Sequence, residues 1–254
     1  MLKVSQLYIE QLKKSIMNAL NSEVPDSVIN PQTLSDQNAA WSQHFWFGDA
    51  LTMSSRARLD NIQVCIEDCL AQNIPGDIAE CGTWRGGAAI LMRGILAAHG
   101  VTDRTVWVAD SFQGLPEPPA NSLDEGMYYA STVIELDRFA VDLATVQGHF
   151  ERYGLLDAQV QFLPGWFSET LPAAPIEQLA VLRLDGDYYE STQDTLAHLY
   201  PKLSVGGYLI IDDWGLDQIC GEKEAVLDYR QAHGITDEII EIDYHSAYWR
   251  KSGK

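Results

Sequence analysis

From residue 75 onward, short apolar runs alternate along the chain with longer stretches in which apolar residues recur every three or four positions. The short runs have the length of buried strands, and the longer stretches have the spacing of amphipathic helices. Strands are predicted at 77–79, 106–109, 159–163, 179–184 and 208–211, and helices at 88–99, 141–153, 190–200 and 222–233. This alternation is typical of βαβ units, so we expect an α/β fold with a mostly parallel sheet covered by helices.

The two ends of the chain follow other patterns. The tail predicts an antiparallel pair of short strands at 239–243 and 246–250, and the start predicts an amphipathic helix within 1–20 and another helix at 58–70. Residues 21–40 are rich in Ser, Asn, Pro and Asp, as in a loop. We therefore expect an N-terminal helical or lid segment over 1–74, contributing to the substrate pocket and to subunit contacts, and a second unit over 75–254.

Two further segments contain side chains that could contribute to a binding site. An aromatic cluster (Trp41, Phe45, Trp46 and Phe47) is predicted to lie in the core, at a subunit interface or in the wall of a substrate pocket. The long excursion at 113–129 contains Pro, Gly and acids, and a loop of that length is often a lid or a binding loop. The six histidines are scattered, and His44 alone lies in the aromatic region, where it could touch a substrate.

Composition and charge narrow the classes of partner. The chain has 254 residues, of which 46% are hydrophobic, and this suits one large domain or two small ones. It carries 36 acidic and 17 basic residues, a formal net charge of −19. Such a charge repels nucleic acid and anionic membrane surfaces and favours a cation, either a metal ion or a positively charged small molecule.

No segment is predicted to cross a membrane, because no apolar run approaches the roughly 20 residues that a spanning helix needs. Glu10, Lys13 and Lys14 interrupt the N-terminal helix where a signal peptide would be apolar. The four cysteines (Cys65, Cys69, Cys81 and Cys220) lack the spacing of a zinc site, so we expect reduced thiols in a cytoplasmic protein.

Each predicted strand is followed by a polar or glycine-rich signal. In chain order these are Glu80 with the glycines after it, Asp110-Ser111, Gly165-Trp166, Asp185-Gly186-Asp187 and Asp212-Asp213. If the strands are parallel, all five signals meet at the carboxyl edge of the sheet, where open α/β sheets bind ligands.

Residues 80–87 (Glu-Cys-Gly-Thr-Trp-Arg-Gly-Gly) form a glycine-rich turn that lets the backbone approach a ligand at the start of a helix. The turn matches neither the dinucleotide-binding nor the phosphate-loop pattern. Because it carries an acid, a diphosphate fits poorly, and an adenosine-bearing cation such as S-adenosylmethionine fits better. Asp110 is predicted to hold the ribose hydroxyls, unless it merely caps the next helix.

Four acids at neighbouring strand ends are the sharpest signal. Asp185, Asp187, Asp212 and Asp213 repel one another unless a cation cancels their charge, and oxygen ligands suit Mg²⁺ or Ca²⁺. Such a metal lowers the pKa of a bound hydroxyl, and Asp187 could be a general base instead of a ligand. Solvated turn acids in an acidic protein are the alternative. No Gly-x-Ser-x-Gly elbow appears, which disfavours a serine hydrolase.

Across residues 7–251 the chain resembles the macrocin O-methyltransferase family, the Mg²⁺-dependent sugar O-methyltransferases of macrolide and aminocoumarin pathways. The matching stretches are 75–87, 103–104, 109–116, 153–157, 162–167, 182–192, 199–204 and 212–213. The resemblance implies a class I methyltransferase fold, Rossmann-like, over 75–254, with S-adenosylmethionine as the methyl donor. The chain departs from the family pattern at 52–55, where Thr-Met-Ser-Ser replaces Thr-Met-Ile-Gly, and it resembles the family least over 21–48.

The resemblance also implies roles for individual residues. It places Mg²⁺ on Asp185, Asp212 and Asp213, and makes Asp187 the base, with Asp185 beside it in catalysis. It places the donor against Thr52, Met53, Glu80, Gly82, Trp84, Arg85, Gly86, Asp110, Ser111, Gly165, Trp166 and Asp185.

We therefore predict an enzyme that methylates a hydroxyl of a glycosylated natural product, most simply on its sugar, and that forms a homodimer or larger homo-oligomer. A catechol-type O-methyltransferase would share the donor and the metal but take an aromatic diol. A non-catalytic metal-binding protein with the same fold would need none of the four acids for activity. An NAD-dependent reductase is disfavoured because the phosphate-binding glycine pattern is missing.

Overall fold

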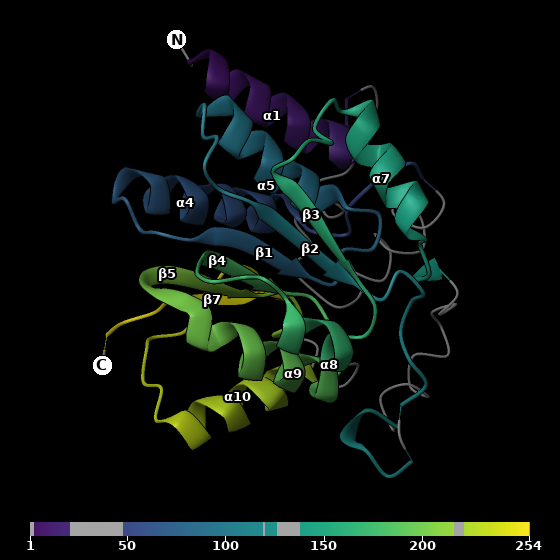
Figure 1. Ribbon diagram of the computed structural model, residues 1–254, viewed down its shortest axis with the longest axis vertical. Coiled ribbons are helices and arrows are strands. Elements are labelled where there is room, and N and C mark those ends of the chain that lie inside the picture. The colour runs from purple at the N-terminus through teal and green to yellow at the C-terminus, as the bar shows by residue number, and fades with distance from the viewer. Residues whose placement is uncertain (1–2, 21–47, 119, 126–137, 216–220, 254) are drawn as a thin grey trace.

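The computed structural model describes residues 3–20, 48–118, 120–125, 138–215 and 221–253. Within these residues, seven strands form one sheet in the order β3-β2-β1-β4-β5-β7-β6 (Figure 1). The strands are β1 Asp77–Cys81, β2 Val106–Asp110, β3 Val160–Pro164, β4 Leu179–Leu184, β5 Leu203–Ile211, β6 Ile240–Glu241 and β7 Ala247–Arg250. Strands β1 to β5 are parallel, whereas β7 pairs antiparallel with both β5 and β6.

Helices cover both faces of the sheet. The helices are α1 Val4–Ile16, α4 Arg56–Ala71, α5 Gly87–Ala98, α7 Leu143–Arg152, α8 Phe167–Thr170, α9 Tyr189–Leu199 and α10 Glu222–His233, with 3-10 turns at Leu171–Ala173 and Tyr200–Lys202. Figure 1 shows α1, α4, α5 and α7 on one face and α8, α9 and α10 on the other. The architecture is therefore the three-layer α/β arrangement that the alternating pattern predicts.

Each face of the sheet has its own apolar core, because successive strand residues point to opposite faces. Ile78 and Val181 belong to the core beneath α1, α4 and α5, whereas Ala79 and Leu182 belong to the core beneath α9 and α10. The strands are buried on both faces and therefore read as continuous apolar runs.

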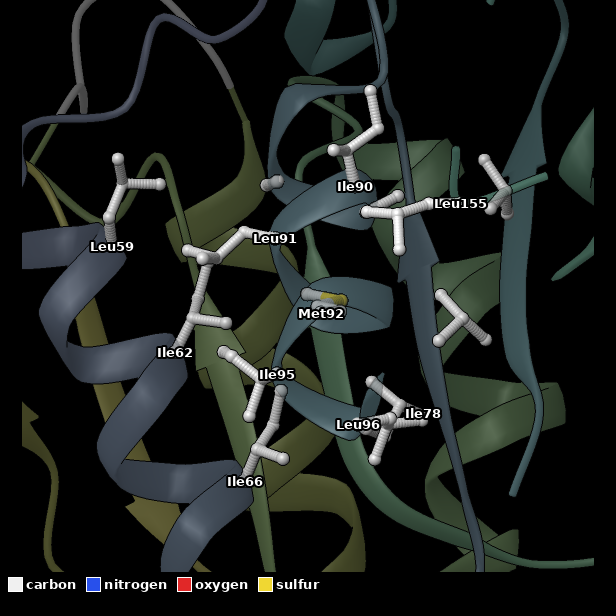
Figure 2. Packing of buried hydrophobic residues seen from close by; sticks show 14 of the residues in the cluster. Leu59, Ile62, Ile66, Ile78, Ile90, Leu91, Met92, Ile95, Leu96 and Leu155 are labelled. Carbon is white, nitrogen blue, oxygen red and sulfur yellow. The ribbon is translucent and has the colours of Figure 1, made fainter. Parts of the chain in front are cut away.

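Helix α5 lies at the centre of the larger core, and ten of its residues are buried. Figure 2 shows Leu59, Ile62 and Ile66 of α4 beside α5 residues such as Leu91 and Ile95. Helix α1 adds Ile9, Leu12 and Ile16 to the same core. The N-terminal helices thus pack onto the sheet domain through one shared core. Because α5 is covered on all sides, apolar residues occur around its whole circumference.

The predicted helices are confirmed, and their ends shift by at most two residues. The first differs more, since α1 covers Val4–Ile16 of the predicted range 1–20. Strand β5 begins at Leu203 instead of residue 208. Gly206 and Gly207 interrupt its apolar pattern, but β5 pairs with β4 on both sides of a register shift at these glycines. The tail pair is confirmed as β6 and β7. Residues 21–47, 126–137 and 216–220 lie outside the described residues, and with them the aromatic cluster, His44 and Cys220.

The cysteines and the apolar lengths of the helices can be compared with the predictions in the described part of the chain. Cys65, Cys69 and Cys81 are buried free thiols, and burial raises the pKa of Cys69 to about 11. None of the helices in the described ranges is long and apolar enough to cross a bilayer.

Candidate active site

A cavity of about 420 Å³ opens at the carboxyl ends of β1 to β5. All five predicted strand-end signals contribute to its lining: Gly82 to Trp84 after β1, Asp110 and Ser111 after β2, Trp166 after β3, Asp185 to Tyr188 after β4, and Asp212 and Asp213 after β5. The prediction that these signals meet at one edge of a parallel sheet is confirmed. Thr52, Met53 and Ser54, which precede α4, close the cavity from another side.

The turn after β1 packs against the end of β4. Gly82 has a φ of +90°, and a Cβ on this residue would lie 1.7 Å from the carbonyl oxygen of Asp185, so only glycine fits. Gly86, with a φ of +86°, caps the start of α5. The turn thereby brings its backbone beside the acids of β4 and leaves the cavity open above it.

Arg85 and Gly86 lie outside the cavity lining, and so does Gly165 after β3. The Arg85 guanidinium donates to the carbonyl oxygens of Gly48 and Ala50 at 3.0 and 2.8 Å and lies 4.2 Å above the Trp84 ring. The structure therefore places Arg85 as the anchor of the segment that leads to Thr52 and Met53.

Asp110 braces two turns at the end of β2. Its Oδ2 accepts from the Thr83 backbone N–H at 2.7 Å, and its Oδ1 accepts from the Phe112 N–H at 2.7 Å. Burial raises the pKa of Asp110, while these hydrogen bonds oppose the rise. The carboxylate thus bonds to turn backbone and also lines the cavity, and its role toward a ribose stays a prediction.

Two buried arginines, which sequence reasoning missed, bind the acids at the base of the cavity. Arg183, in the middle of β4, donates from Nη1 to Glu80 Oε1 and Asp185 Oδ2, each at 2.7 Å, and its Nη2 lies 2.5 Å from Asp212 Oδ1. Arg58 of α4 donates from Nη1 to Asp212 Oδ2 at 2.6 Å and from Nη2 to the Met53 carbonyl at 3.2 Å. Asp212 is thus held by one guanidinium on each carboxylate oxygen.

The metal-ligating atoms that gather most tightly in the described residues belong to Asp212, Asp213 and His245, all within 4.8 Å of one another. His245 Nδ1 lies 2.8 Å from the Asp212 carbonyl oxygen and 3.7 Å from Asp213 Oδ1. The Asp213 backbone N–H donates to Glu222 Oε2 at 2.7 Å. His245 and Glu222 were missed because distant segments, the β6–β7 turn and the start of α10, bring them here.

Two of the three acids bound by Arg183, Asp212 and Asp185, have pKa values shifted in opposite directions. Burial alone would raise the pKa of Asp212, but Arg183 and Arg58 lower it to about 2. Burial raises the pKa of Asp185 well above its usual range despite Arg183, which Asp185 shares with Glu80 and Asp212. The number of guanidinium groups on each acid accounts for the difference.

Asp187 and Asp213 lie in the same negative field. Burial, and then the charges of Asp212 and Asp110, raise the pKa of Asp187 to about 7. Burial and the neighbouring Asp187 and Glu222 raise the pKa of Asp213 well above its usual range. Asp187 has a φ of +60° and follows the end of β4, so a turn, and not a strand edge, carries it into the cavity with Asp185.

A divalent cation fits this donor set. Six buried or half-buried carboxylates gather here with two guanidinium groups, whose ion pairs within this set are with Glu80, Asp185 and Asp212. The six are Glu80, Asp185, Asp187, Asp212, Asp213 and Glu222. The excess negative charge, raised pKa values and oxygen donors are the conditions under which proteins bind Mg²⁺ or Ca²⁺. Asp185 faces the cavity but lies outside the tight group of three, which instead includes His245.

The site and the fold agree with comparisons to known proteins. A sequence model of the macrocin-O-methyltransferase (TylF) family matches residues 5–251. The chain belongs to this family. It is therefore an O-methyltransferase, and its fold is that of S-adenosylmethionine-dependent methyltransferases.

Characterised members of the family are similar over most of their length. Demethyldecarbamoylnovobiocin O-methyltransferase from Streptomyces niveus is 53% identical over 82% of this chain and 78% of its own. Mycinamicin III 3''-O-methyltransferase from Micromonospora griseorubida is 46% identical over 97% of both chains. The solved O-methyltransferase NovP is 45% identical, with a TM-score of 0.85 over 98% of this chain and 99% of its own.

More distant structures share the fold alone. The calicheamicin methyltransferase CalS11 is 20% identical, with a TM-score of 0.59 over 96% of this chain and 91% of its own. The fold is therefore shared with a protein whose sequence differs widely from that of this chain.

Proposed function

We propose that the protein transfers a methyl group from S-adenosylmethionine to a sugar hydroxyl of a glycosylated natural product, with Mg²⁺ bound beside the acceptor. One observation carries the proposal: a single cavity joins the glycine turn and Asp110 to the acids after β4 and β5. Family membership supports the chemistry, and the names of the relatives support the kind of acceptor.

The donor is assigned to the side of the cavity formed by β1, β2 and β3. Asp110 accepts the ribose hydroxyls, and the turn of Glu80, Gly82 and Trp84 faces the methionine part. Thr52, Met53, Ser111, Trp166 and Asp185 complete this side, while Arg85, Gly86 and Gly165 shape it from outside the lining. The acidic surroundings favour a sulfonium cation over a diphosphate.

The metal is assigned to Asp185, Asp212 and Asp213, with His245 beside them. Mg²⁺ bound there would supply a positive charge that lowers the pKa of the acceptor hydroxyl. Arg58 and Arg183 keep Asp212 ionised and fixed, so this ligand is in place before a cation arrives.

Asp187 is assigned as the general base. A pKa of about 7 lets its carboxylate accept a proton near neutral pH. The acceptor oxygen loses its proton to Asp187 and forms a bond to the methyl carbon as the bond from that carbon to sulfur breaks, which leaves a neutral thioether. Alignment and charge placement supply much of the acceleration, since no covalent enzyme intermediate is needed.

The charge of the site favours a finished glycoside over a sugar nucleotide as acceptor. The cations lining the described part of the cavity are Arg58 and Arg183, and both bind carboxylates. Segments 21–47, 126–137 and 216–220 contain acids but neither Lys nor Arg. In the described lining of the cavity, no pair of cations is thus left to bind a diphosphate, which needs paired cations.

Two measurements test the proposal. Calorimetric titration of chelator-treated protein with S-adenosylhomocysteine, with and without Mg²⁺, tests the donor and the metal, and no binding in either condition would exclude the donor. Methyl transfer is then measured by mass spectrometry on demethyldecarbamoylnovobiocin, on mycinamicin III, on a nucleoside diphosphate deoxysugar and on a catechol. Turnover of the sugar nucleotide or the catechol in preference to both glycosides would contradict the acceptor class.

We also propose that the protein self-associates through α1. Val4 and Leu7 of this helix are 83% and 47% exposed, and Tyr8 beside them is 39% exposed. Exposed apolar side chains in such a group are typical of subunit contacts. Light scattering after size-exclusion chromatography should give a dimer or larger, and Leu7→Glu should reduce the mass to that of one chain.

A further inference from the structure

The loop that follows β2 is fastened at its far end by one buried carboxylate. Among the described residues 120–125, Asp124 alone is buried, with 1% of its surface exposed, whereas Leu123 beside it is 49% exposed. Asp124 Oδ1 and Oδ2 accept from the backbone N–H of Tyr189 at 2.9 and 3.0 Å. Because the apolar side chain of this segment is largely exposed, its attachment depends on the carboxylate.

Tyr189 is the first residue of α9, so Asp124 caps this helix from a position 65 residues away. Tyr188, which precedes the helix, is not of a type that caps helices locally. A carboxylate at a helix N-terminus bonds to exposed N–H groups and is favoured by the helix dipole. The capped end directly follows the turn that carries Asp185 and Asp187.

Gly221 shows how closely three segments meet at this point. A Cβ on Gly221 would lie 2.6 Å from Asp124 Oδ1 and 2.8 Å from the Cβ of Tyr189. The far end of the loop, the start of α9 and the residue before α10 therefore form one contact, and a side chain larger than glycine at 221 would force them apart.

The near end of the same loop is fastened to the predicted donor site. The Phe112 N–H donates to Asp110 Oδ1 at 2.7 Å, and Ser111 Oγ donates to the Gly114 carbonyl at 2.8 Å. Between the two fastened ends, residues 114–117 line the cavity. This stretch of wall thus depends on Asp110 at one end and on Asp124 at the other.

We propose that Asp124 is a positioning residue that holds residues 114–117 in place as a wall of the donor side of the cavity. The inference rests on the proposed donor site, and it assigns a function to a buried acid that methyl transfer itself does not use. Without the carboxylate, residues 120–125 lose this attachment to the start of α9, whereas the hydrogen bonds of Asp110 and Ser111 at the near end remain. The apparent affinity for the donor is then the intrinsic affinity multiplied by the fraction of molecules in which the wall is in place.

The test compares four variants by calorimetric titration with S-adenosylhomocysteine. Asp124→Ala removes the cap, Gly221→Ala displaces it without removing the charge, and Asp124→Asn keeps one acceptor oxygen. Asp142→Ala is the matched control, since Asp142 caps α7 locally by accepting from the Thr145 N–H at 2.7 Å and lies outside the cavity lining. Hydrogen exchange of residues 114–117 and 189–192 is measured on the same proteins.

If the loop is in place in about a tenth of the molecules after the cap is lost, the dissociation constant rises about tenfold. We expect this rise for Asp124→Ala and Gly221→Ala, a smaller rise for Asp124→Asn and none for Asp142→Ala, with faster exchange at 114–117 in the first two. Unchanged affinity in Asp124→Ala and Gly221→Ala would overturn the proposal and leave Asp124 a helix cap only. If Asp124→Ala does not fold, Gly221→Ala and Asp124→Asn decide the question. Failure of the unmodified protein to bind S-adenosylhomocysteine would instead contradict the donor site itself.

Discussion

Asp212 and Asp213 are adjacent, yet the structure predicts opposite consequences for their replacement by asparagine. Asp212 is buried and accepts from Arg183 and Arg58, one guanidinium on each oxygen. Asp212→Asn keeps the shape but removes the negative charge that both guanidinium groups contact, so among the described residues Arg183 keeps only its ion pairs with Glu80 and Asp185, and Arg58 keeps only that with Asp243, at 3.4 Å. In the Asp213 variant, one member of a repelling group of carboxylates is neutralised.

The expected magnitudes separate the two variants clearly. Breaking a buried ion pair by changing one partner costs about 3–5 kcal/mol, because the other charge remains buried. For a domain of this size each kcal/mol lowers the melting temperature by about 2–4 °C, so Asp212→Asn should lower it by roughly 6–20 °C. Asp213→Asn should leave the melting temperature unchanged or raise it, since the pKa of Asp213 is raised by burial and by neighbouring acids.

Metal binding should respond differently from stability. We expect Asp213→Asn to weaken Mg²⁺ binding at least about tenfold, a typical cost of altering a metal site, while the affinity for S-adenosylhomocysteine stays within a factor of about two. The assays are thermal melting followed by circular dichroism and calorimetric titration of chelator-treated protein with Mg²⁺. Asp142→Asn, an exposed acid far from the cavity, serves as the control for charge loss.

Two results would refute this reasoning. If Asp212→Asn melts at the temperature of the unmodified protein, the two arginines do not depend on Asp212 as their contacts indicate. If Asp213→Asn binds Mg²⁺ as tightly as the unmodified protein, Asp213 is not a ligand, and the donor atoms must come from Asp212, Asp185 or His245.

Three further predictions follow from single contacts. Asp110→Ala should weaken S-adenosylhomocysteine binding at least about tenfold, or about 1.4 kcal/mol, in calorimetric titration, and unchanged binding would remove Asp110 from the donor site. Arg85→Ala releases the Gly48 and Ala50 carbonyls, so it should weaken the same binding several-fold, whereas full binding in Arg85→Lys, which keeps the charge, would point to charge and not to the two guanidinium hydrogen bonds. The pKa of Asp187 is raised from 3.8 to about 7, so between these pH values the folded chain keeps a proton that the unfolded chain has lost. The free energy of unfolding of the metal-free protein should therefore fall as the pH rises from about 4 to about 7. Denaturant unfolding across that range should show a flatter pH dependence in Asp187→Asn, and an identical slope in both proteins would contradict the raised pKa.

The fold was predictable because strands and helices differ in length and period along the chain. The stretches at 179–184 and 222–233 have the same bounds in the structure as β4 and α10. Strand β5 was half predicted, since Gly206 and Gly207 hide a pairing that its neighbours on both sides maintain. The four-residue helix α8 was missed because it contains no buried residue and so leaves no apolar period to detect.

The site was predictable where its residues follow strands directly. The order of the strands carries Asp110, Asp185 and Asp212 to one edge, so local sequence and the rule for parallel sheets suffice. The residues that come from elsewhere were missed. Arg58 lies in α4 among helical apolar positions, and His245 lies in a tail turn whose docking depends on β7 pairing with β5. Arg183 alone left a signal, as a charge in the middle of an otherwise apolar strand.

These missed residues explain how so many carboxylates can lie at one buried edge of the sheet. Arg183 is paired with Glu80 on the neighbouring strand and also reaches Asp185 and Asp212, so one guanidinium ties the donor turn to the metal acids. Arg58 ties Asp212 to the Met53 carbonyl, and so to the segment that closes the cavity. The two guanidinium groups fix the positions of Glu80, Asp185 and Asp212, and the carboxylates beyond their reach keep the excess negative charge that the proposed metal ion and sulfonium would neutralise. Some carboxylates of the cluster are thus held in position by the arginines, and others keep the charge that would bind a ligand cation. If every carboxylate were neutralised by an arginine, no negative charge would be left to bind such a cation.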